Sequence, residues 1–164
     1  MILGMSVATF TLVHVALSLV GILTGLVVLF GMFSSKKLPT STALFLATTV
    51  LTSATGFFFP RDQILPAHIV GVISLAVLAF AIFALYERHL AGPWRWIYVA
   101  GAVLALYLNV FVGVVQAFQK LAFLQPLAPT QSEPPFVVAQ VVVLVIFIVL
   151  GVLALRSFHP QPDT

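Results

Sequence analysis

The chain alternates between long apolar runs and short polar connections. Five runs are long enough to cross a membrane as helices, because a spanning helix needs about 20 consecutive apolar residues. They cover residues 7–33, 40–59, 66–86, 96–118 and 136–155. The connections between these runs are too short to form a separate domain. The pattern therefore predicts an all-α integral membrane protein, with residues 1–164 forming one bundle of five transmembrane helices.

Composition supports this prediction. Hydrophobic residues make up 62% of the chain and charged residues 7%, whereas a soluble domain carries roughly 25% charged residues. Cysteine is absent, which excludes disulfides, iron–sulfur clusters and thiolate metal sites. The basic residues are too few to indicate nucleic-acid binding. The first apolar run has no basic residue before it and is too long for a typical signal peptide, so we expect it to be retained.

The basic residues predict how the bundle is oriented, because cytoplasmic connections carry an excess of Lys and Arg. In a five-helix arrangement one side receives Lys36, Lys37, Arg88, Arg95 and Arg156. The other side receives only Arg61 and Lys120. This bias predicts an outside N-terminus and a cytoplasmic C-terminus.

Small and polar residues mark the faces on which membrane helices pack. The first helix carries a stripe made of His14, Ser18, Gly21 and Gly25. The fourth carries a stripe made of Gly101, Ala105, Asn109, Gly113 and Gln116. Gly21 and Gly25 form a GxxxG motif. This motif either packs two helices of one chain or joins the chain to a second copy or a partner membrane protein.

The polar residues are unevenly distributed in depth. At about 1.5 Å of rise per residue, most lie in the predicted outer half of the bundle, and the inner half holds mainly Leu, Val, Ala and Phe. The candidate ligand-binding residues are His14, Thr52, Thr55, His68, Asn109, Gln116 and Gln140. Many hydroxyls in such a set bond the carbonyl one turn back. The scarcity of polar groups beyond Asn109 argues against an open channel.

A cavity lined by hydroxyls, amides and imidazole would suit an amphipathic small ligand such as a quinone or a lipid. Phe57, Phe58 and Phe59 would roof it, or alternatively form an interfacial aromatic belt. Residues 119–135 form a proline-rich connection that either lies on the membrane surface or folds over the bundle mouth. No hydrolase motif, phosphate-binding loop or pair of membrane carboxylates occurs. The sequence therefore predicts a binding or accessory protein without catalytic residues.

The two membrane histidines support a second hypothesis. An ionisable residue within a span indicates function by default, and His14 and His68 could be the axial ligands of a b-type haem. Their predicted depths differ by about 7 Å on that helical rise, which is awkward for ligands of one iron. Alternatively both are neutral and hydrogen-bonded to neighbouring side chains. A third hypothesis is a purely structural membrane subunit.

Several segments resemble a family of small bacterial multi-span proteins of uncharacterised function. They are TALFLATTVLTSATGFFFP, LPAHIVGVISL, WRWIYVAGAVLALYLNVFVGVVQAFQKL and LAPTQSEPPF. The resemblance covers residues 12–153 and implies a bacterial inner-membrane location, with no activity or cofactor attached. Within the last segment we expect Ser132 or Thr130 to cap the fifth helix, with Glu133 favouring its N-terminus.

Overall fold

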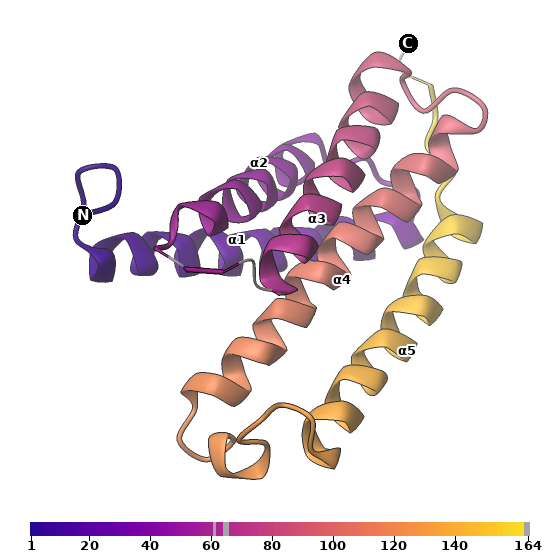
Figure 1. Ribbon diagram of the computed structural model, residues 1–164. Coiled ribbons are helices and arrows are strands. Elements are labelled where there is room, and N and C mark those ends of the chain that lie inside the picture. The colour runs from indigo at the N-terminus through magenta and orange to yellow at the C-terminus, as the bar shows by residue number, and fades with distance from the viewer. Residues whose placement is uncertain (61, 64–65, 163–164) are drawn as a thin grey trace.

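The structure is a computed structural model that describes residues 1–60, 62–63 and 66–162. Its elements are α1 (Val7–Phe33), α2 (Pro39–Thr55), the 3₁₀ turn η1 (Gly56–Phe58), α3 (Pro66–Ile82), the π-helical turn η2 (Phe83–Glu87), α4 (Trp94–Lys120), the 3₁₀ turn η3 (Gln125–Leu127) and α5 (Pro134–Ser157) (Figure 1). Among the described residues, five helices are long and apolar enough to cross a membrane. The predicted all-α, five-helix architecture is confirmed. Arg61, which contributed to the predicted topology, lies outside the described residues.

The helix boundaries agree with the apolar runs to within a few residues, with one informative exception. The predicted second helix reaches residue 59, but α2 ends at Thr55 and the chain tightens into η1. Glycine at position 56 weakens the helix, since it has a high conformational entropy to lose. The tight turn changes the directions in which the three following phenylalanines point.

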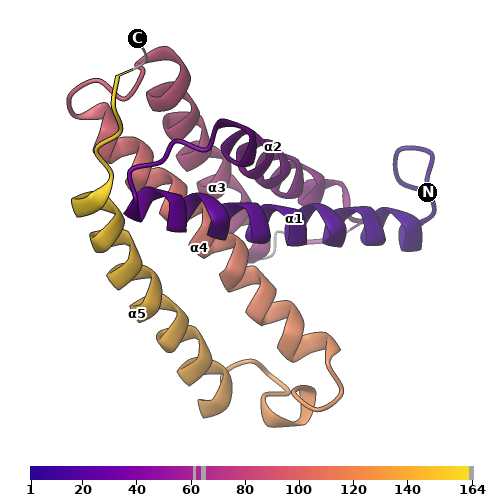
Figure 2. The same cartoon turned by 180° about the vertical axis from the view of Figure 1, so that it is seen from behind.

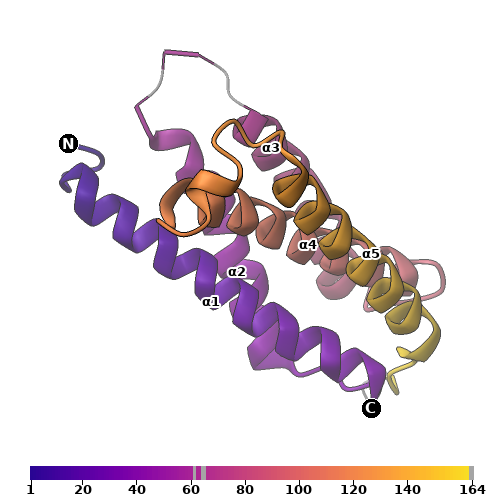
Figure 3. The same ribbon diagram turned by 90° about the horizontal axis from the view of Figure 1, so that it is seen from below.

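The helices converge at one end of the bundle and diverge at the other. We call these the C-terminal end, where α5 finishes, and the N-terminal end, where α1 begins. Figures 1 and 2 show that the α1–α2 pair and the α4–α5 pair meet near the C-terminal end and spread apart toward the N-terminal end. Seen from below, α1 and α2 form one side of the molecule and α3 and α5 the other (Figure 3).

The apolar core lies in the converging half. It includes Val28, Leu29, Met32, Phe45, Leu78, Val99 and Leu106. These residues come from the second half of α1, the first half of α2, the end of α3 and the first half of α4. The half predicted to be apolar is therefore the half that packs most closely.

The GxxxG motif packs helices within the chain. Gly21 and Gly25 are both buried. A Cβ on Gly25 would lie 2.7 Å from Cδ1 of Leu106 in α4 and 2.9 Å from the ring of Phe45 in α2. Glycine at this position thus allows α2 and α4 to approach α1, which is how small residues act at helix contacts in membranes.

The end of α5 is fastened by side chains from two other segments. Nη1 of Arg95 donates to the carbonyl oxygens of Leu155, at 2.9 Å, and Phe158, at 2.8 Å. Oγ of Ser35 donates to the carbonyl of Ser157 at 2.6 Å. A cation near the last carbonyls of a helix also complements its dipole. Arg95, considered above only as topological evidence, is therefore a structural cap of α5.

Candidate functional site

The divergence of the helices leaves a cavity of about 640 Å³ in the N-terminal half of the bundle. Ligand pockets typically measure about 300–1,000 Å³. Its walls come from α1, α2, the segment around η1, α3 and α4. Its polar lining consists of Thr11, His14, Ser18, Thr52, Ser53, His68, Ser74, Asn109, Gln116 and Lys120. The remaining lining is apolar, so the cavity combines a few hydrogen-bonding groups with hydrocarbon walls.

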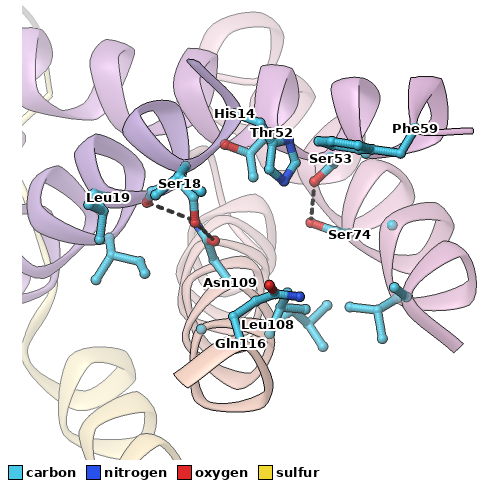
Figure 4. A pocket seen from close by; sticks show the side chains of 18 of the residues that line it. His14, Ser18, Leu19, Thr52, Ser53, Phe59, Ser74, Leu108, Asn109 and Gln116 are labelled. Carbon is cyan, nitrogen blue, oxygen red and sulfur yellow. Dashed lines mark hydrogen bonds between the residues drawn. The ribbon is translucent and has the colours of Figure 1, made fainter. Parts of the chain in front are cut away.

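His14 stands on the α1 wall of this cavity (Figure 4). Its Nδ1 lies 2.8 Å from the hydroxyl oxygen of Thr55, which does not itself line the cavity. The single hydroxyl proton of Thr55 is directed to the carbonyl of Leu51, at 2.6 Å. We infer that Nδ1 is the donor to Thr55, because the hydroxyl proton is directed to the backbone. The tautomer with the proton on Nδ1 satisfies both contacts.

Two of the three consecutive phenylalanines contact the membrane histidines. Phe59 meets His14 edge-on, with ring centroids 5.2 Å apart, and Phe57 stacks on His68 at 5.5 Å. Both phenylalanines line the cavity, whereas Phe58 is 51% exposed and does not. At the η1 turn, Phe57 and Phe59 thus face the cavity. Phe58, which lies between them in the sequence, points away from it.

Two polar pairs on the cavity walls bridge helices. Oγ of Ser18 donates to Oδ1 of Asn109 at 2.8 Å and joins α1 to α4. Oγ of Ser53 donates to Oγ of Ser74 at 3.1 Å and joins α2 to α3 (Figure 4). The hydroxyl of Thr52 donates within α2 to the carbonyl of Thr48 at 2.8 Å. These bonds satisfy buried polar groups, as membrane helices require.

Gln116 and Lys120 differ from those pairs. They lie one turn apart on α4, line the cavity and are exposed. Neither side chain makes a hydrogen bond or ion pair with any residue that the structure describes. Figure 4 shows the amide of Gln116 reaching into the cavity from α4. Lys120 was absent from the candidate residues above, although its i+4 spacing from Gln116 places the two on one helix face.

Gln140 lies outside the cavity. Its Nε2 donates to the carbonyl of Phe111 at 3.2 Å, between α5 and α4. Its Oε1 is buried and has no hydrogen-bond partner among the described residues. Of the seven candidates from the sequence, His14, Thr52, His68, Asn109 and Gln116 line the cavity together. Thr55 stands behind His14, and Gln140 is separate.

The proline-rich connection packs against the ends of α4 and α5. Within residues 119–135, only Lys120 and Leu121 line the cavity. Nε2 of Gln131 donates to the carbonyl of Val115 at 3.3 Å, and Phe118 meets Phe136 edge-on with ring centroids at 5.4 Å. The first contact holds the connection against α4, and the second joins α4 to α5 where the connection leaves them.

The expected cap of the fifth helix is wrong. Glu133 occupies the N-cap position of α5 without capping through its side chain. Its carboxylate accepts from the Thr130 hydroxyl at 2.7 Å and from the N–H of Ser132 at 3.1 Å. The hydrogen bond from the Thr130 side chain is the largest cause that lowers the pKa of Glu133, and backbone N–H groups add to it. The carboxylate therefore stabilises the turn before α5.

The two candidate haem ligands line the same cavity from different helices. His14 comes from α1 and His68 from α3. Within the described part of the chain no three His, Asp or Glu side chains gather into a metal site. The hydrogen bond from Nδ1 of His14 to Thr55 is of the kind that orients metal-bound histidines.

Comparison of the chain with protein-family models, curated proteins and solved structures finds no match. A functional inference must therefore rest on the cavity, its walls and the hydrogen bonds of its side chains.

Proposed function

We propose that this protein is a multi-pass membrane protein that binds an amphipathic small molecule, of the quinone or lipid class, in the cavity between α1 and α4. The main support is the contrast within one cavity of about 640 Å³. The hydroxyls of Ser18, Ser53 and Thr52 bond other groups of the protein, while the side chains of Gln116 and Lys120 have no partner in the described part of the chain. Those two side chains offer hydrogen bonds that a ligand can take.

The chemistry of these groups favours a head group with acceptor oxygens. The amide N–H of Gln116 and the ammonium of Lys120 are donors. The amide oxygen of Gln116 is an acceptor. A quinone presents carbonyl oxygens to such donors, and its reduced form presents hydroxyls to such an acceptor. A quinone head group therefore matches the two side chains in both of its redox states.

The membrane placement follows from the charges. Lys36, Lys37, Arg88 and Arg156 lie at the C-terminal end, and Lys120 lies at the N-terminal end. By the positive-inside rule, this distribution supports a cytoplasmic C-terminus and a cavity in the outer half of the membrane. The resemblance noted above favours a bacterial inner membrane. A C-terminal alkaline phosphatase fusion should be inactive, and an active one would reverse this orientation.

Binding can be tested by calorimetric titration of a short-tailed benzoquinone into the protein in lipid nanodiscs, with empty nanodiscs as the blank. We expect saturable binding that Gln116→Ala weakens about fivefold, the equivalent of one hydrogen bond. Gln119→Ala is the matched control, because Gln119 lies on the same helix but outside the cavity. Absence of saturable binding, or equal loss in both variants, would refute the proposal.

A b-type haem protein is the second candidate, supported by the presence of His14 and His68 on the walls of one cavity. The visible spectrum of protein purified from haem-replete cells separates the two candidates. A Soret band that is lost in both His14→Ala and His68→Ala would establish haem ligation. A folded, colourless protein would exclude it.

A further inference from the structure

The cavity extends to the outer surface of the bundle between α1 and α4. Val15 and Leu19 both line the cavity, yet they are 40% and 55% exposed. Side chains at a rim, where a cavity meets the surroundings, combine these two properties. Figures 1 and 2 show α1 and α4 spreading apart toward this region. The cavity thus has a lateral opening, bordered by apolar side chains.

Gly113 lies on the α4 side of this opening. A Cβ at this position would meet only Cδ1 of Ile22, at 3.8 Å, which is an ordinary contact distance. The comparison with other glycines is informative. On the same helix, a Cβ at Gly101 would lie 3.1 Å from Cβ of Ala81. On α1, a Cβ at Gly25 would lie 2.7 Å from Cδ1 of Leu106. Those two glycines permit close packing, whereas Gly113 lines the cavity and has room for a Cβ.

We infer that the apolar tail of the ligand lies in this opening, beside Gly113, and reaches the bilayer between α1 and α4. The inference rests on the proposed function and specifies it: the ligand is a tailed, membrane-dissolved quinone. The head group then lies at Gln116 and Lys120, one and two turns from Gly113 toward the end of α4. Val15, Leu19 and Ile22 supply the apolar wall opposite.

The arrangement makes Gly113 a determinant of tail binding. A Cβ at this position has no neighbour closer than 3.8 Å, and the rest of a leucine side chain would extend into the tail path. The head-group donors would be left unchanged. Substitution should therefore discriminate between ligands that share a head group and differ in the tail.

The experiment compares a decyl-substituted benzoquinone with its methyl-substituted analogue, in nanodiscs, on the wild type, Gly113→Leu and Gly113→Ala. We expect Gly113→Leu to weaken binding of the decyl compound by about tenfold, through overpacking of the tail path. Binding of the methyl analogue should change less than about twofold. Gly113→Ala should bind both compounds as the wild type does, because a Cβ fits there. Leu19→Trp, at the exposed rim of α1, should repeat the selective loss and provides a second variant if Gly113→Leu does not fold.

The other outcomes are distinct. If both compounds bind the wild type and both variants retain the decyl compound, the tail lies elsewhere and the inference fails while the proposed function stands. If Gly113→Leu weakens both compounds equally, the head group occupies the position beside Gly113, which also overturns the inference. If the wild type binds neither compound, the proposed function and the inference fail together.

Discussion

Nδ1 of His14 lies 2.8 Å from the hydroxyl of Thr55, and that hydroxyl donates its own proton to the backbone of α2. A residue behind the cavity wall therefore orients the imidazole of His14, which lies on that wall. Many threonines in membrane helices only bond their own backbone. Thr55 does this and also accepts from His14, so its hydroxyl links α2 to α1.

Thr55→Val should weaken quinol binding although Thr55 does not touch the cavity. The substitution keeps the shape of the side chain and removes the acceptor, so the imidazole is released to rotate and to change tautomer. We expect a loss of about fivefold in affinity, the equivalent of one hydrogen bond, measured by the same titration in nanodiscs. Thr24→Val is the control, since Thr24 bonds only the backbone of α1. Unchanged affinity in Thr55→Val would show that the pair does not position the ring.

Gly25→Ala should destabilise the bundle. Its Cβ would lie within 2.7 Å of Leu106 and 2.9 Å of Phe45, and overpacking of this kind costs about 1–3 kcal/mol. Reversible unfolding in mixed detergent micelles measures the loss, with Gly113→Ala as a matched control that we expect to be neutral. Full stability in Gly25→Ala would contradict the packing of the GxxxG motif within the chain.

Arg95→Met should loosen the end of α5. The variant removes the donor to the carbonyls of Leu155 and Phe158, and hydrogen bonds from a charged group contribute about 1.5–3 kcal/mol. Faster hydrogen exchange is expected over residues 155–159. Arg156→Met, at an exposed neighbouring arginine, should leave exchange unchanged. Equal hydrogen exchange in the two variants would show that Arg95 does not cap α5.

Much of this architecture could be predicted from the sequence. The lengths of the apolar runs set the number of helices, because few other structures satisfy the backbone in lipid. The stripe of His14 and Ser18 and the stripe containing Asn109 correctly marked the faces that meet, since helical spacing alone brings their members together. The difference in polarity between the two halves of the bundle was predicted from the depth of each polar residue along its helix.

The sequence could not give the divergence of α1 from α4. Helix crossing depends on how side chains interdigitate across three helices, as Gly25 does with Phe45 and Leu106, and no linear pattern specifies it. For the same reason the sequence could not separate Gln140 from the cavity residues. Its predicted depth matches theirs, but α5 packs on the other side of α4. The role of Thr55 required the distance between two helices.

The turn before α5 should depend on pH. Hydrogen bonds lower the pKa of Glu133, so the carboxylate stabilises the folded turn. This stabilisation is complete above the ordinary pKa of glutamate and is lost as the pH falls through the lower folded value. Protection of the Thr130 and Ser132 amides from exchange, corrected for intrinsic rates, should fall in that acidic range. Glu133→Gln should show the reduced protection already at neutral pH, and Glu87→Gln should not. Constant protection in Glu133→Gln would contradict the assignment.

Photolabelling tests the central claim most directly, because it identifies where a quinone binds. The purified protein in nanodiscs would be irradiated with an azido-quinone, with and without excess unlabelled quinone, and the labelled peptides mapped by mass spectrometry. Binding in the cavity predicts label within residues 11–22 of α1 and 108–121 of α4, suppressed by the competitor. Label confined to the exposed face of α5, or label that the competitor does not reduce, would contradict the account.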